Sequence, residues 1–414
     1  MDNKLLSNTQ SRLAQYLWYV AGAVIICEVG SFFCWDTAYF WLPEAGTLPA
    51  PADKWFFLVG ILCTYAAALA IAGRIVSTPL CSRMPSVFLG VSSSFVFLII
   101  LIFTLRSYYS RSFLAVAFTV SFFWLYAGQR LFFSVNQIRY GFTHGSAIQE
   151  LRDEWRDNFV EISSPDSREE FDILVISPRQ DHPLPQEWAR YITNMMIHGV
   201  PVAHPGTVYE FFAGRLPLQY MVDGPGVFIH PKRVYFYLKY LCDWAMLAVF
   251  AIPSLLCIGI VSLAILFSSG QPIFFVQERI GKNGAPFRMV KFRSMTGAGE
   301  ITAIGRLLRK YRMDELPQIW NILKGEMSFI GPRPETPELT QLYTKKIPFY
   351  PYRYSILPGI TGWAQVNYGY ASVTSENKIK LSYDLYYVKH ASLLLDILIV
   401  LKTIKTILIG FGAK

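Results

Sequence analysis

The sequence predicts a membrane protein of the α plus α/β class. We expect a four-helix transmembrane bundle, a small α/β domain, and a re-entrant membrane helix with a compact second α/β domain. Three observations favour this fold class. The chain has 414 residues, enough for two or three domains, and 53% of them are hydrophobic while only 16% are charged. Four apolar runs come first, and strand-like and helix-like segments alternate after them. A fifth apolar run, interrupted by a proline, separates the two α/β regions.

The first 134 residues contain the four apolar runs, at residues 16–34, 55–76, 86–105 and 112–129. Each is close to the roughly 20 residues that span a bilayer as a helix, and no small-residue cleavage site marks the first as a signal peptide. Most of the flanking basic residues place both ends of this bundle in the cytoplasm, although Arg106 and Arg111 favour the opposite orientation. The runs contain almost no ionisable residue apart from Glu28, so we expect an anchor rather than a channel or an oligomerisation surface.

Residues 135–231 have the pattern of a small soluble domain with a parallel sheet. A strand-like run at 171–177 is followed by a helix-like run at 185–198 and a short strand at 200–203. A dinucleotide fold needs a Gly-x-Gly-x-x-Gly turn after its first strand, and here only Gly141-Phe-Thr-His-Gly145 occurs, with no strand predicted before it. We therefore expect a degenerate Rossmann-like domain with a regulatory or packing role rather than nucleotide binding.

The fifth apolar run, residues 244–268, is long enough to cross a bilayer. Both of its flanks are basic, and positive charge on both sides disfavours a single crossing. Pro253 removes one helical hydrogen bond and clashes with the preceding turn, which predicts a kink beside Ser254. We predict a re-entrant helix-break-helix over residues 234–268 that enters and leaves on the cytoplasmic face. A kinked true span is the alternative.

Residues 232–414 contain the second α/β domain, with segments expected to seek the membrane surface. Residues 302–313 predict a basic amphipathic helix, and residues 345–354 mix basic side chains with phenylalanine and tyrosine. Such combinations favour the lipid head-group layer. The C-terminal run, residues 392–410, is apolar but contains charged residues such as Asp396, so we expect an interfacial or packing helix rather than a span.

The strongest candidate for a chemical site is the stretch 309–335. Asp314 and Glu315 are expected to open a helix, with Asp314 as the N-cap and Pro317 in the first turn. A helix N-terminus attracts phosphate, two adjacent carboxylates can hold a divalent metal, and one of them can act as a nucleophile. Basic residues surround the pair: Arg306, Arg309, Lys310, Arg312 and, in a rigid Gly-Pro-Arg-Pro turn, Arg333. This pattern indicates phosphate chemistry, and a capped helix with a solvated charged face is the alternative.

Several further motifs occur in order around this stretch. They are Gln277-Glu-Arg-Ile-Gly-Lys-Asn-Gly284, Lys291-Phe-Arg-Ser-Met295, Gly331-Pro-Arg-Pro334, Pro358-Gly-Ile-Thr-Gly-Trp-Ala-Gln-Val-Asn367 and Tyr383-Asp-Leu-Tyr-Tyr387. Each motif is weak alone, but in this order and behind a proline-broken apolar hairpin they are highly specific. Residues 232–414 thereby resemble the bacterial sugar transferases, which are polyprenyl-phosphate glycosyl-1-phosphate transferases, also called monotopic phosphoglycosyl transferases. With its four spans and second soluble domain, the whole chain resembles the large members of that family.

The resemblance implies a reaction in which Asp314 attacks the β-phosphate of a UDP-sugar and releases UMP. The covalent sugar-phosphoryl-aspartate would then pass the sugar phosphate to undecaprenyl phosphate in a ping-pong sequence. By the same resemblance Glu315, together with Asp314, would hold Mg²⁺. The substrate-binding residues that it implies are Lys291, Arg293, Arg309, Gln318, Arg333, Asp384 and Asp396. For Asp384 and Asp396 a structural salt bridge is the alternative, and the short loop 296–301 leaves the choice of sugar open.

The resemblance also implies a place of action and partners. It indicates the bacterial inner membrane, with the catalytic domain facing the cytoplasm, at the first membrane step of exopolysaccharide, capsule or O-antigen assembly. Downstream glycosyl transferases and a second copy in a homodimer are the implied protein partners. A glycosyl transferase that moves only the sugar and a non-catalytic membrane scaffold are the alternative functions.

The overall charge and the cysteines fit this picture. The net charge of +9 suits anionic lipids and substrates, and no nucleic-acid recognition motif occurs, so we expect no nucleic-acid partner. None of the six cysteines forms a CxxC pair, and we expect buried thiols rather than disulfides or a zinc site.

Overall fold

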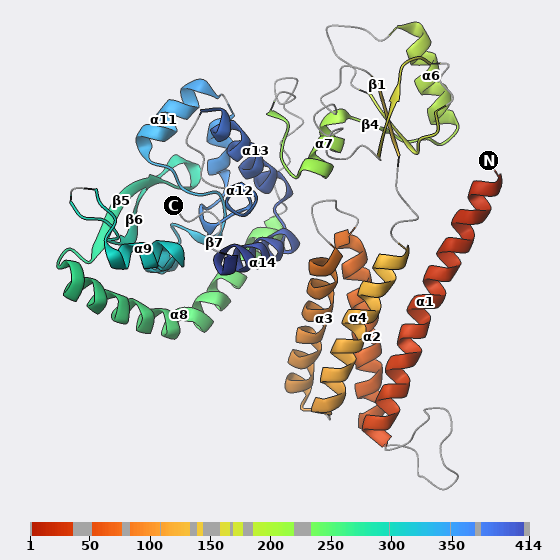
Figure 1. Cartoon of the computed structure of the whole chain (residues 1–414), viewed down its shortest axis with the longest axis horizontal. Helices are drawn as coiled ribbons and strands as arrows, with labels where there is room; N and C mark the ends of the chain where they lie inside the picture. Colours follow the sequence, from red (N-terminus) through yellow and green to blue (C-terminus); the bar gives the residue numbers. More distant parts are fainter. Residues whose placement is uncertain are drawn as a thin grey trace. The chain divides into compact units, whose positions relative to one another are not determined.

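The computed structural model describes residues 2–35, 52–76, 83–107, 109–132, 139–143, 158–165, 169–176, 185–218, 233–297, 299–347, 349–368 and 374–409. The chain divides into two compact units, Met1–Ala213 and Gly214–Lys414 (Figure 1). The finer division into three domains, at residues 134 and 231, stays a prediction.

Four long helices open the first unit and lie side by side (Figure 1). They are α1 (Asp2–Trp35), α2 (Ala52–Val76), α3 (Arg83–Leu105) and α4 (Arg111–Phe132). The helical prediction for all four apolar runs is therefore confirmed, and α2, α3 and α4 are long and apolar enough to cross a membrane. Their facing sides form one core around Ile61 and Phe113, while Phe97 and Phe103 are exposed. Exposed aromatic rings on a helix bundle are typical of a lipid-facing surface. Residues 36–51, between α1 and α2, lie outside the described residues.

The rest of the first unit contains the predicted parallel sheet, which is confirmed. Its strands are β1 (Tyr140–Thr143), β2 (Phe159–Ile162), β3 (Ile173–Val175) and β4 (Val202–Ala203), all parallel in the order β2-β1-β3-β4. Helices α6 (Gln186–Ile197) and α7 (Pro205–Ala213) accompany them. Gly141 lies inside β1, so the segment that begins with it is itself part of a strand and not a turn after one. A Cβ there would lie 2.7 Å from both Ile162 and Phe171, so glycine at this position allows the strands and side chains to pack closely.

The second unit combines helices with two small sheets. Strands β5 (Phe274–Ile280) and β6 (Pro286–Phe292) form an antiparallel hairpin, and β7 (Ser328–Ile330) pairs in parallel with β8 (Gly359–Thr361). The helices are α8 (Arg233–Ser269), α9 (Ala303–Lys310), α10 (Ile319–Leu323), α11 (Pro337–Lys346), α12 (Trp363–Asn367), α13 (Thr374–His390) and α14 (Leu393–Ile409). Three 3₁₀ segments complete the described elements: η5 (Lys282–Gly284), η6 (Met313–Gln318) and η7 (Tyr350–Ser355).

Helix α8 is the apolar run before the hairpin, and it is long and apolar enough to cross a membrane. Helical structure continues through Pro253, so the predicted break does not interrupt the helix; Figure 1 shows one long helix with a curved axis. Its first half packs through Leu247 against Met289 and neighbouring residues, and its second half packs through Ile265 against Phe292. Both halves of α8 therefore contact the same globular unit.

The aromatic and basic segment 345–354 is not the surface patch that its composition predicts. Tyr350 and Tyr354 are buried in a core with Leu381 and Leu385 of α13. Arg353 is buried with them because it forms an ion pair with a buried acid, described below. Tyrosine and arginine side chains occur both at membrane surfaces and in protein cores. Here the partners that α13 supplies place them in the core.

Candidate active site

A cavity of about 920 Å³ lies in the second unit, above one face of the β5–β6 hairpin. Alternate residues of β5 point into it, namely Phe275, Gln277 and Arg279, because successive strand residues face opposite sides. The other charged residues that line it are Lys291, Arg293, Arg309, Arg312, Asp314, Glu315, Arg333, Glu335 and Lys380. Cations outnumber carboxylates among them, so the cavity favours an anionic ligand.

The two adjacent carboxylates lie in η6, a 3₁₀ segment that leads into α10. The predicted N-cap role of Asp314 is wrong, because the residue before this segment is Arg312, in a left-handed conformation with φ of 54°, and no side chain caps it. Leu316 anchors the segment by packing against Phe292 and neighbouring residues. The carboxylate of Asp314 is thus not engaged in capping and remains available to the cavity.

Glu315 is held by two cations. Lys291 Nζ lies 3.2 Å and Arg333 Nη2 lies 2.9 Å from the same oxygen, Glu315 Oε1. Burial alone would raise the pKa of Glu315, but the charges of Arg333 and Lys291 outweigh it and lower the pKa from 4.5 to about 2. The other oxygen, Oε2, is buried and has no hydrogen-bond partner among the described residues. Glu315 is therefore a fixed anion with one oxygen available to a further ligand.

Asp314 has a different environment from its neighbour. It is partly exposed to the cavity and forms no ion pair with any described residue. Burial and the adjacent charge of Glu315 raise the pKa of Asp314 above 3.8, although nearby cations oppose the shift. A carboxylate with a raised pKa and no ion pair to a protein side chain is the more reactive nucleophile of the two.

Two arginines of the candidate set are anchored at the β6 end of the cavity. Arg309, near the end of α9, donates from Nε to Ser294 Oγ at 3.0 Å. Arg293 donates to the carbonyl oxygens of Ser269, Gly270 and Gln271, at the C-terminal end of α8. Arg293 therefore ties the hairpin to the end of the apolar helix, and Arg309 presents its guanidinium beside the carboxylates.

Arg333 is positioned by a turn that only glycine allows. A Cβ on Gly331 would lie 2.3 Å from the carbonyl oxygen of Leu357, and one on Gly359 would lie 2.0 Å from the nitrogen of Gly331. This close approach lets the turn after β7 bend against β8, and Arg353 Nη2 donates to the carbonyl oxygen of Arg333 at 2.8 Å. The guanidinium of Arg333 is thereby directed at Glu315.

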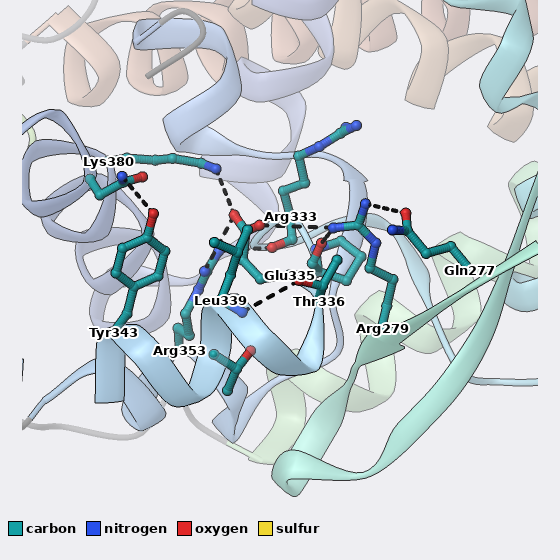
Figure 2. A network of polar contacts seen from close by, with 12 residues as sticks. Gln277, Arg279, Arg333, Glu335, Thr336, Leu339, Tyr343, Arg353 and Lys380 are labelled. Atoms are coloured by element: carbon teal, nitrogen blue, oxygen red, sulfur yellow. Dashed lines mark hydrogen bonds and ion pairs between the residues drawn. The ribbon is translucent and has the colours of Figure 1, made fainter. Parts of the chain in front are cut away.

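Glu335 forms a second charged centre in the cavity wall, shown in Figure 2. Lys380 Nζ lies 2.8 Å from Oε1, Arg353 Nη1 lies 3.8 Å from the same oxygen, and Arg279 Nη1 lies 3.9 Å from Oε2. Burial alone would raise the pKa of Glu335, but the charges of Lys380 and Arg353 outweigh it and lower the pKa. Glu335 thus links β5, η7 and α13 at one side of the cavity.

Three of the predicted site residues do not line the cavity. Gln318 is buried in η6. Asp384 accepts a hydrogen bond of 2.7 Å from Arg353 in a buried ion pair, the structural alternative considered for it. Asp396 accepts from Tyr387 at 2.6 Å, Tyr235 at 3.0 Å and Lys239 at 3.2 Å, and so joins α8 to α13 and α14. The substrate-binding roles of these three residues stay predictions.

Several further residues line or shape the cavity without being distinguished as site residues by the sequence. Gln277 and Arg279 lie in the motif Gln277–Gly284. The period-two pattern that begins at Phe275 predicts that both lie on one face of a strand. Tyr343, Asn377 and Lys380 come from two helices that the sequence separates by about 30 residues, and no local pattern relates them.

Comparison with known proteins agrees with the resemblance. The model of the bacterial sugar transferase family matches residues 234–410. The UDP-N-acetylgalactosamine-undecaprenyl-phosphate N-acetylgalactosaminephosphotransferase of Aeromonas hydrophila is 40% identical over 255 residues, covering 58% of this chain and 60% of that protein. The sugar transferase EpsL of Bacillus subtilis is 40% identical over 156 residues, 35% of this chain and 74% of that protein. A UDP-glucose:undecaprenyl-phosphate glucose-1-phosphate transferase of Escherichia coli is 38% identical over 167 residues, 37% of this chain and 35% of that protein.

Proposed function

Because the chain belongs to the bacterial sugar transferase family, we propose that it transfers a sugar 1-phosphate from a UDP-sugar to undecaprenyl phosphate and releases UMP. The relatives from A. hydrophila and E. coli are named for transferases of this kind. The observation that carries the proposal is Asp314, which faces a cation-rich cavity beside Glu315, whose charge Lys291 and Arg333 already neutralise.

The proposed chemistry is a double displacement at one phosphorus atom. An oxygen of Asp314 forms a bond to the β-phosphorus of the donor, and the bond from that phosphorus to the bridging oxygen breaks, so UMP leaves with the bridging oxygen. An oxygen of the lipid phosphate then bonds to the same phosphorus, and the bond to Asp314 breaks, which restores the carboxylate. No net proton is needed. Arg309 and Arg333 lie where they can stabilise the phosphate charge throughout.

We propose that Glu315 and Asp314 also hold Mg²⁺. The described residues contain no group of three or more His, Cys, Asp or Glu side chains able to hold a metal, so an all-protein site is not present among them. Mg²⁺ is commonly held by one or two carboxylates together with substrate phosphates, and the buried, unpartnered Glu315 Oε2 fits that arrangement. A bound ion would neutralise the charge of the donor diphosphate.

We further propose that α8 is re-entrant and that the catalytic unit lies at the cytoplasmic face of the bacterial inner membrane. A straight helix of 37 residues would be roughly 55 Å long and would carry its ends to opposite sides of a bilayer. Yet Lys239 near its start pairs with Asp396, and Ile265 near its end packs against Phe292, in the same unit. A re-entrant α8 would bring Asp314 close to lipid, where a soluble donor and a lipid acceptor could both reach it.

The products test the proposed reaction. The detergent-solubilised full chain, incubated with undecaprenyl phosphate, Mg²⁺ and a panel of UDP-sugars, is expected to release UMP with at least one donor. Release of UDP instead would indicate transfer of the sugar alone. No nucleotide release with any donor would favour the non-catalytic scaffold. The same panel identifies the sugar that the protein transfers.

The acid limb of the pH profile of kcat/KM should reflect the ionisation of Asp314. Only ionised Asp314 can attack, and burial together with the charge of Glu315 raises its pKa above 3.8, so kcat/KM for UMP release should begin to fall at a higher pH than for an ordinary aspartate. Arg309 lowers that pKa, so Arg309→Gln should move the acid limb to higher pH. Lys310→Gln removes the same charge from the next residue of α9, which does not line the cavity, and should leave the limb in place. An acid limb unmoved by Arg309→Gln would contradict the assignment to Asp314.

A further inference from the structure

The side chains of β5 that line the cavity change from apolar to polar along the strand. Phe275, Gln277 and Arg279 share the face that lines it, and Phe275 lies directly opposite Lys291 in the hairpin register. At about 3.4 Å per residue, Phe275 and Arg279 lie roughly 14 Å apart along the strand. Lys291, which binds Glu315, marks the position of the carboxylates near the Phe275 side of this axis.

The Phe275 end contains apolar side chains and adjoins the end of α8, and the cations Lys291 and Arg293 also line it. Half of the surface of Phe275 is exposed, and Pro272 and Met295 also line this end. Arg293 binds the carbonyl oxygens at the end of α8, where Phe267 is 86% exposed. The Phe275 end of the cavity therefore lies beside the end of a helix that has the length and composition of a membrane segment.

The opposite end is polar. Arg279 donates to Gln277 Oε1 at 2.7 Å and pairs with Glu335, and Lys380 pairs with Glu335 from its other side (Figure 2). Beyond Lys380, Asn377 donates to the hydroxyl of Tyr343 at 2.8 Å, and both residues line the cavity. Such amide, hydroxyl and cationic groups can hydrogen-bond to the hydroxyl and carbonyl groups of a nucleotide sugar.

The two displacements place a constraint on where the substrates bind. In-line attack requires the leaving oxygen of the donor, and later the attacking oxygen of the acceptor, to lie opposite Asp314. The two phosphates therefore occupy the same place in turn, and only the remainders of the two molecules can bind apart. We propose that the polyprenyl chain leaves the cavity past Phe275, and that the donor binds toward Gln277, Tyr343 and Asn377. This assignment rests on the proposed transfer reaction.

Separate half-reactions test the assignment. Without acceptor, the UMP burst of the full chain at increasing UDP-sugar concentration gives the apparent dissociation constant of the donor (the donor constant). Discharge of the preformed intermediate at increasing polyprenyl phosphate concentration gives the apparent dissociation constant of the acceptor (the acceptor constant). Phe275→Ser should raise the acceptor constant about tenfold and leave the donor constant unchanged. Asn377→Ala should raise the donor constant about fivefold and leave the acceptor constant unchanged. Val276→Ser, on the opposite face of β5 and equally exposed, and Lys378→Ala, next along α13, should change neither.

The outcomes separate this inference from the function on which it rests. If the parent protein shows no UMP burst with any donor, the transfer reaction itself is wrong. If the parent protein shows the burst but Phe275→Ser changes the donor constant, the assignment of the two ends is wrong. It is also wrong if Phe275→Ser and Asn377→Ala change the same constant. If each variant melts at the same temperature as the parent protein, unfolding does not cause the changed constant.

Discussion

Replacing Asp314 by asparagine is expected to abolish UMP release, with a loss of kcat of about four to six orders of magnitude. The amide cannot form the bond to phosphorus, so the burst without acceptor should disappear as well. The same variant should melt at a higher temperature. The raised pKa of Asp314 means that the folded state disfavours its charge, so ionised Asp314 destabilises the protein at every pH above its ordinary pKa of 3.8.

Opposite effects on activity and stability distinguish a lost nucleophile from a damaged fold. Glu326→Asn or a similar change outside the cavity lining should leave the burst intact. Mass spectrometry of the acid-quenched burst should find the sugar-phosphoryl group on the peptide that contains Asp314 in the parent and not in the variant. An Asp314→Asn protein that releases UMP at the parental rate would show that the nucleophile is elsewhere.

Contiguous features of this protein could be predicted from the sequence. The apolar runs are helices because their length and composition leave few alternatives, and the parallel sheet follows from alternating strand and helix patterns. Asp314, Glu315 and Arg333 converge because they lie within one short stretch and a rigid turn. Lys291 could be placed with them only through the family resemblance, since β6 lies outside that stretch.

Features that depend on tertiary partners could not be predicted in this way. Aspartate is common at N-caps, but Asp314 lies inside a 3₁₀ segment whose Leu316 packs against a core formed with α8 and β6. Arg353 and its tyrosines have the composition of a membrane-surface patch, but Asp384 on α13 supplies a buried counter-charge. In both cases the deciding contact comes from an element distant in sequence.

The buried ion pair between Arg353 and Asp384 is expected to contribute strongly to the stability of the second unit. Among the described residues, Asp384→Asn leaves the buried guanidinium of Arg353 with only the more distant Glu335, at 3.8 Å, as a charged partner. Removing one member of a buried ion pair costs about 3 to 5 kcal/mol. Chemical denaturation of the detergent-solubilised full chain should show this loss, and faster hydrogen exchange in η7 and α13 should assign it to the second unit. Activity should fall too, because Arg353 also holds the carbonyl oxygen of Arg333.

Two further variants separate the loss of the pair from the loss of an isolated charge. Arg353→Met with Asp384→Leu removes both charges and leaves neither buried alone, so the double variant should be more stable than Asp384→Asn. Lys380→Met removes a pair whose lysine is 20% exposed, against 2% for Arg353, and should cost about 1 kcal/mol or less. If Asp384→Asn unfolds at the parental denaturant concentration, the pair does not stabilise the unit. Arg353 would then act on Arg333 through the hydrogen bond to its carbonyl oxygen alone.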